Sequence, residues 1–288
     1  MTAITGEHVA IAELVIYIPI ALVTIFVVFR HGFHKQLGWI YLLIFCVVRV
    51  AGAILQILSH KNPDDSKEKE WAAILSSVGL SPLILASLGF LKRVFDETTS
   101  RTPNPKTSQR IQMLSASSGI IGRLLGLYSK RATAVSRRSR AVQLLHIPAL
   151  ISLILAISGG TDQASSNPSD QHSGKHESRA AIILFVLVYV ALALLWVITA
   201  RDLPVLVTSQ RRIYFAVFLA LPFMAVRLLY SLIGGFGHDR RFSVVDGDTA
   251  VQLGMATIEE FVVVLVYTIL GVVTPRSDAG SPVPGARV

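Results

Sequence analysis

The sequence predicts an all-α membrane protein, a bundle of seven transmembrane helices in one domain. Of its 288 residues, 52% are hydrophobic and only 16% are charged, and the mean hydropathy is +0.58. A soluble globular protein has no core large enough to bury so much apolar sequence. The apolar residues fall in seven runs of about 20, the length that an α-helix needs to cross a bilayer, and none alternates like a membrane β-barrel.

The predicted helices share long strings of Leu, Ile, Val, Ala and Phe. We place them at about 9–29, 38–58, 71–91, 141–158, 180–199, 213–233 and 251–273. The first run has no Lys or Arg ahead of it and no clear cleavage site, so we expect a retained helix and not a secretory signal. Four of the helices contain a proline that is expected to bend them: Pro19, Pro82, Pro148 and Pro222.

The segments between the helices are polar. Residues 92–140 carry eleven Lys or Arg and only two acidic residues, and residues 121–128 place apolar side chains on one helical face. We expect a basic loop that binds anionic lipid headgroups. A disordered loop whose charge only sets the topology is the alternative, and nucleic-acid binding is not expected. Residues 161–178 are predicted to form a flexible loop, and 276–288 a disordered tail.

The distribution of Lys and Arg predicts the orientation, because cytoplasmic segments retain positive charge. With the amino terminus outside or lumenal and the carboxy terminus in the cytoplasm, the inner segments hold 18 of these residues and the outer segments 7. Eleven of the 18 come from residues 92–140, so this loop carries the prediction. The sequence leaves the organelle open between the endoplasmic reticulum and the plasma membrane, and it indicates neither protein partners nor an oligomeric state.

Four charged residues stand inside the apolar runs, where a charge is costly unless it is paired or solvated. They are Arg49, Arg227, Glu259 and Glu260. Counted from the outer ends of their helices at about 1.5 Å per residue, all four lie roughly 9 to 14 Å below the outer surface, and Glu13 lies near the same depth. Two cations and two or three carboxylates at one depth can neutralise one another, so we expect them to share a site.

Polar side chains at a similar depth predict a pocket around these charges. They are Gln56 and Tyr230, which follow the two arginines on the same helix faces, and Ser77 and Ser81 in the third helix. We expect these four residues and the two arginines to bind a lipophilic molecule that enters from the bilayer.

Glu259 and Glu260 are consecutive, so their side chains point about 100° apart on a helix and can have different roles. If one pairs with an arginine, the other, buried beside a like charge, would stay protonated at neutral pH and could act as a general acid. The alternative is a structural network of ion pairs between helices. Neither a metal nor a cofactor is expected, because the helices hold no cluster of Cys, His or Asp ligands and no Gly-rich phosphate loop.

Three segments carry a resemblance to a known family. They are GWIYLLIFCVVRVAGAILQI at 38–57, VGLSPLILASLGFLKRV at 78–94 and MATIEEFVVVLVYTILGVVTP at 255–275. With its tryptophan-led second helix, Gly-Leu-Ser-Pro turn and Glu-Glu helix, the chain resembles a family of fungal seven-pass membrane proteins that has no established activity. More distantly, it is similar to the fungal integral-membrane terpene cyclases of meroterpenoid pathways. That similarity implies buried carboxylates that start the cyclisation of a prenyl chain.

Two functions of different classes follow. The first is a terpenoid or meroterpenoid cyclase of secondary metabolism. In this function Glu259 or Glu260 is the general acid, and Arg49 and Arg227 are cations that orient the substrate. The second is a non-enzymatic receptor-like or lipid-handling protein, in which the same charges form a lock between helices.

Overall fold

The computed structural model describes residues 6–31, 37–61, 71, 74–75, 78–101, 137–164, 167–237 and 249–274. The long helices are α1 (Gly6–His31), α2 (Leu37–Lys61), α4 (Leu80–Arg101), α7 (Arg137–Ala164), α8 (Pro168–Thr199), α9 (Thr208–Phe236) and α11 (Ile258–Val273). A 3₁₀-helix, η1 (Ala200–Val205), follows α8, while α10 (Thr249–Gln252) and η3 (Leu253–Thr257) lead directly into α11. The prediction of an all-α protein is confirmed for the described residues.

Within the described residues, six helices are long and apolar enough to cross a membrane: α1, α2, α7, α8, α9 and the continuous helix α10–η3–α11. Their outward faces are apolar. On α1, for example, Ile11, Val15, Ile18 and Leu22 are exposed and follow one another every three or four residues. Such faces suit lipid and not water. The protein is therefore a helical membrane protein.

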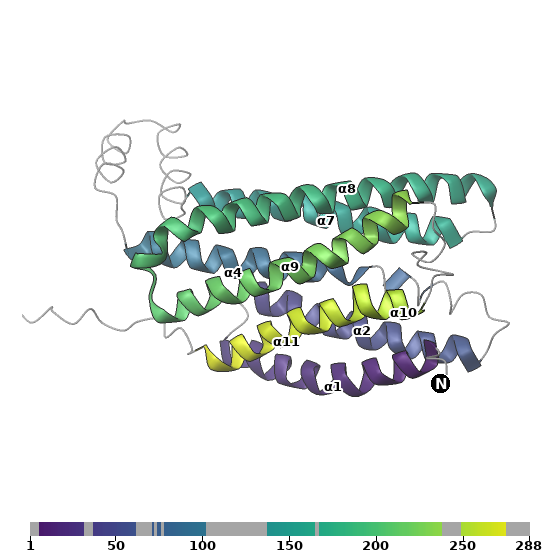
Figure 1. Cartoon of the computed structure of the whole chain (residues 1–288), viewed down its shortest axis with the longest axis horizontal. Coiled ribbons are helices and arrows are strands. Elements are labelled where there is room, and N and C mark those ends of the chain that lie inside the picture. Colours follow the sequence, from purple (N-terminus) through teal and green to yellow (C-terminus); the bar gives the residue numbers. More distant parts are fainter. Residues whose placement is uncertain are drawn as a thin grey trace, which may run out of the picture.

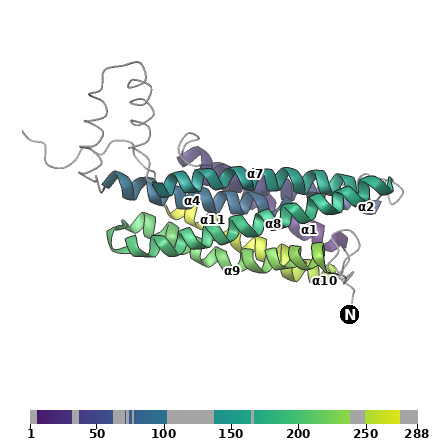
Figure 2. The same ribbon diagram turned by 90° about the horizontal axis from the view of Figure 1, so that it is seen from above.

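Helix α4 is the central helix of the bundle. It packs against α2, α7, α8, α9 and α11, and it lies in the middle of the bundle in Figure 1 and Figure 2. Nearly every residue from Val78 to Leu91 is buried. The side chains of this segment therefore contact other helices, while the helices around α4 supply the surface that faces lipid.

The start of α4 corrects the place of one interruption. In the third helix predicted at 71–91, the described residues 71, 74, 75 and 78 are helical, but Gly79 is in a turn and α4 begins at Leu80. Pro82 therefore lies in the first turn of α4, where a backbone N–H has no intrahelical partner and proline is tolerated. The other three prolines of this group lie inside α1, α7 and α9, as expected.

Two segments predicted as loops are helical in part. Helix α7 continues to Ala164 and α8 begins at Pro168, so the prediction of a flexible loop at 161–178 is wrong. Likewise, both ends of the basic segment 92–140 belong to α4 and α7. Its middle, with the predicted amphipathic face at 121–128, lies outside the described residues, as does the tail 276–288.

A close contact between α7 and α8 explains the first of these corrections. A Cβ on Gly159 would lie 2.8 Å from the carbonyl oxygen of Gly174. Across this crossing Gln163 Nε2 of α7 donates hydrogen bonds to the carbonyl oxygen of Gly174 at 3.3 Å and to Ser178 Oγ at 2.6 Å, both on α8. Small and polar residues join these helices, and their sequence carries no apolar period to reveal a helix.

The last helix contains a π-turn ahead of its two glutamates. At Leu253–Thr257 the backbone forms hydrogen bonds between residues five apart, such as that from the N–H of Ile258 to the carbonyl oxygen of Leu253. A π-turn holds one more residue than an α-turn, and such turns are rare and frequent at functional sites. Glu259 and Glu260 lie in the first turn of α11, directly after it.

Candidate functional site

Four charged side chains from four helices meet inside the bundle. They are Glu13 of α1, Arg49 of α2, Arg227 of α9 and Glu260 of α11, and we call them the charge quartet. All four are buried. Their two positive and two negative charges cancel, which is the condition under which ionised groups are tolerated at membrane depth.

Glu260 is the centre of the charge quartet. Its Oε1 accepts a hydrogen bond from Arg227 Nε at 2.7 Å, and its Oε2 accepts one from Arg49 Nη2. Only 1% of the residue is exposed. Both of its oxygens are therefore engaged by cations. Glu259, the neighbouring carboxylate, is not a member of the charge quartet.

Arg227 has further partners on its own helix. Its Nη1 donates to Ser231 Oγ at 2.6 Å, and its Cζ lies 5.4 Å from the centroid of the Tyr230 ring. The second contact has the geometry of a cation–π interaction. Tyr230, predicted from its spacing to Arg227, thus lies beside the charge quartet.

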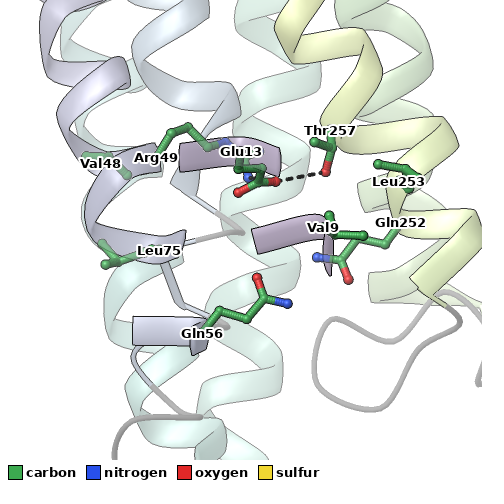
Figure 3. Close-up of a pocket in the computed structure, with 10 residues that line it drawn as sticks. Val9, Glu13, Val48, Arg49, Gln56, Leu75, Gln252, Leu253 and Thr257 are labelled. Atoms are coloured by element: carbon green, nitrogen blue, oxygen red, sulfur yellow. Dashed lines mark hydrogen bonds and ion pairs between the residues drawn. The ribbon is translucent and has the colours of Figure 1, made fainter. Parts of the chain in front are cut away.

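Glu13 is the least tightly held member of the charge quartet. Its Oε1 lies 3.6 Å from Arg49 Nη1 and accepts a hydrogen bond from Thr257 Oγ1 at 3.3 Å. Figure 3 shows Glu13 between Arg49 and Thr257. Arg49 Nε is buried and has no hydrogen-bond partner in the part of the chain that the structure describes. The Arg49 guanidinium therefore retains an unused donor on a buried side chain.

A small pocket lies beside Glu13 and Arg49 (Figure 3). Its volume is about 20 Å³, which is room for one water molecule. The polar lining residues are Glu13, Arg49, Gln56, Gln252 and Thr257, and the others are Val9, Val48, Gly52, Leu75 and Leu253. Gln56, predicted to bind a ligand, thus lies in the wall. At this volume the pocket is far smaller than a prenyl chain requires.

The remaining predicted residues lie apart from these ion pairs or are not described. Glu259 is half-buried, and its Oε2 has no hydrogen-bond partner among the described residues. Ser81, in the first turn of α4, is fully buried, and its Oγ is likewise unpaired within that part of the chain. Ser77 lies outside the described residues.

Gly79 belongs to the site although its sequence context did not single it out as a site residue. A Cβ at this position would lie 2.7 Å from Glu260 Oε2 and 3.0 Å from Arg49 Nη2. Because Gly79 directly precedes α4, the Glu260 carboxylate also lies at the amino-terminal end of that helix, where the helix dipole favours negative charge. The one sequence feature that could have indicated Gly79 is the Gly-Leu-Ser-Pro sequence, in which a glycine stands just before the start of a helix. Thr257 was also missed, because nothing in its sequence neighbourhood marks a π-turn.

Comparison with known proteins identifies a family but no activity. A family described as a domain of unknown function (DUF7702) matches residues 5–127 and 112–277, and so covers most of the chain. No curated protein and no solved structure matches the chain.

Proposed function

The chain belongs to the DUF7702 family, and we propose that it binds a lipophilic small molecule at the charge quartet without converting it, as a receptor-like or lipid-handling membrane protein. One observation carries this proposal. Glu260, the most buried carboxylate, is held by both Arg49 and Arg227, so it is committed to ion pairing and not to proton donation.

The charge quartet acts in this function as a lock between helices. It joins α1, α2, α9 and α11 at one point, and α1 otherwise packs mainly on α2 and α11. When an ion pair at membrane depth is broken, bulk water is not there to solvate the remaining charge. A ligand that exchanges with one member of the lock would therefore change how α1 is held.

We further propose that the bundle crosses the membrane seven times, with α4 and the residues ahead of it as the third crossing. Helix α4 has 22 residues, but five of its last ten are charged, so the residues ahead of it are needed to complete an apolar crossing. Ahead of it, Ile74 lies against Gly160 near one end of α7, and within it Gly89 lies against Gly38 at the start of α2. An odd number of crossings puts the termini on opposite sides. By the charge distribution, the amino terminus is outside or lumenal.

The binding function is tested with photoactivatable, alkyne-tagged lipid probes. The full-length protein in nanodiscs is illuminated with a tagged long-chain acid or a tagged isoprenoid alcohol, and the labelled peptides are mapped by mass spectrometry. We expect labelling on the segments of α1, α2 and η3 that line the pocket, with the unreacted probe recovered unchanged. If no probe labels these segments, the binding function is wrong. If the probe is converted, the protein is an enzyme.

A specific observation favours a second function, that of a terpenoid cyclase. Glu259 is not needed for the charge balance of the quartet, and one of its oxygens is unpaired in the described part of the chain. A spare, half-buried carboxyl group is the type of group that can protonate an alkene or an epoxide. In this function Glu259 is the general acid, and the charge quartet orients the substrate.

The cyclase function is tested in microsomes that carry the protein and receive prenylated or epoxidised substrates. Cyclised product should form, and it should disappear in Glu259→Gln. Glu7→Gln makes the same change on α1, outside the charge quartet, and should retain the activity. Full turnover by Glu259→Gln would remove this second function.

A further inference from the structure

We infer that the ligand of this site carries an anionic head group, of the kind found in a long-chain carboxylic acid, and that this group takes the place of the Glu13 carboxylate beside Arg49. The inference rests on the proposed binding function and names the chemical class of its ligand. Three features of the charge quartet support it: its charge balance, its unequal contacts and its access.

The charge balance requires an anion at the position of Glu13. Arg49, Glu260 and Arg227 are in direct contact and together carry one net positive charge. Glu13 compensates this charge from α1, a different helix. An uncompensated cation is unfavourable at membrane depth. A ligand that displaces Glu13 therefore has to bring a negative charge of its own.

The contacts show which carboxylate is the exchangeable one. Glu260 accepts a hydrogen bond at 2.7 Å from Arg227 and a second one from Arg49, whereas Glu13 stays 3.6 Å from Arg49. Arg49 is 4% exposed, and its Nε has no hydrogen-bond partner among the described residues. A carboxylate that approaches the guanidinium edge-on can engage two of its N–H groups, the geometry that Arg favours.

The pocket reaches the charge quartet at Glu13 and Arg49, the pair whose contact is the loosest. Glu13 and Arg49 line the pocket, next to the half-buried Gln56 and Gln252. The apolar wall beside them, with Val9 among its residues, offers contacts to the first carbons of a chain. Because the pocket holds only about 20 Å³, the head group replaces the Glu13 carboxylate and is not added to it. This requirement makes Glu13 the competitor of the ligand.

The test compares two photoactivatable probes that have the same chain and differ only in the head group, a carboxylic acid or a neutral alcohol. The full-length protein is reconstituted in nanodiscs of neutral lipid, and labelling of the pocket segments is measured against probe concentration. We expect the acid to label at lower concentration than the alcohol. Excess unlabelled long-chain acid should compete, and acetate at the same concentration should not.

The variants test the role of Glu13. Glu13→Gln removes the competing carboxylate and should lower the half-saturating concentration of the acid probe by about tenfold, which corresponds to about 1.4 kcal/mol of competition removed. Glu13→Asp keeps the negative charge on a shorter side chain. Its half-saturating concentration for the acid probe should lie between those of the unchanged protein and of Glu13→Gln. Glu7→Gln, on the same helix, should leave labelling unchanged. Size-exclusion chromatography checks that each variant is folded.

The outcomes separate this inference from the function on which it rests. Equal labelling by acid and alcohol overturns the anionic head group but leaves the binding function in place. Competition by acetate as strong as that by the long-chain acid overturns the lipophilic class of the ligand. Unchanged or weaker acid labelling in both Glu13 variants overturns the exchange with Glu13. No labelling by either probe overturns both the inference and the binding function.

Discussion

Gly79 and Glu260 lie so close that a Cβ at residue 79 would be 2.7 Å from the Oε2 atom of the glutamate. The missing side chain lets the start of α4 approach a buried carboxylate of α11. Gly79→Ala should therefore displace this carboxylate from its arginines. We expect a loss of about 1–3 kcal/mol in the free energy of unfolding, the usual cost of added volume in a packed core, measured by denaturant unfolding in detergent.

Gly254 provides the matched control for this substitution. It lies in the π-turn of the same bundle, is exposed, and a Cβ there would have no heavy atom within 4 Å. Gly254→Ala should change the free energy of unfolding by no more than about 0.5 kcal/mol. Equal losses in the two variants would show that the contact with Glu260 does not explain the effect.

The two adjacent glutamates should differ in their contribution to stability. Glu260→Gln leaves Arg49 and Arg227 with Glu13 as their remaining carboxylate. It should lower the free energy of unfolding by about 3–5 kcal/mol, the range for removing one partner of a buried ion pair. Glu259→Gln is the same chemical change outside the quartet and should cost far less. Denaturant unfolding in detergent compares the two variants. Similar losses would contradict the central place of Glu260.

A double-mutant cycle should show coupling between Arg227 and Glu260. The double variant Arg227→Gln with Glu260→Gln removes one charge of each sign and leaves Arg49 to pair with Glu13. Its loss of stability should be smaller than the sum of the two single losses by about 0.5–3 kcal/mol, the range for residues in direct contact. Additive losses would mean that the hydrogen bond at 2.7 Å contributes no net coupling.

The proposed orientation predicts which end of α8 faces the cytoplasm. Cys46 is the chain's one cysteine and is buried, so Cys46→Ala gives a background for labelling. Exposed Asn167 and Arg201 lie just beyond opposite ends of α8. In sealed microsomes, a membrane-impermeant maleimide should label Arg201→Cys directly and Asn167→Cys only after permeabilisation. The reverse pattern would contradict the proposed topology, which is seven crossings with the amino terminus outside or lumenal.

The depth of the charged residues could be predicted from the sequence because a helix rises by a fixed amount per residue. Counting from the ends of the apolar runs brought Arg49, Arg227 and Glu260 to one level, and the structure shows them in contact. The rotation of the last helix could not be predicted in this way. It depends on the π-turn at Leu253–Thr257, which has no compositional signature.

The helical ends of α7 and α8 were hidden for a different reason. Sequence periodicity reveals a helix through the apolar face that it buries. Where these two helices extend past their apolar segments, they are joined by the close contact of Gly159 with Gly174 and by the hydrogen bonds of Gln163 to Gly174 and Ser178. Contacts made by backbone and amide groups leave no periodic trace, so the segment resembled a loop.

The π-turn has a consequence for the winding of the last helix. It holds one residue more than an α-turn, so each residue after it is rotated back by about 100° relative to an uninterrupted helix. If this extra residue moved along the chain past Glu260, the first turn of α11 would rewind by one position. Glu259 would then stand where Glu260 now meets Arg49 and Arg227. With two consecutive glutamates, a carboxylate would then meet the same arginines in either winding, and the charge balance of the bundle would not change.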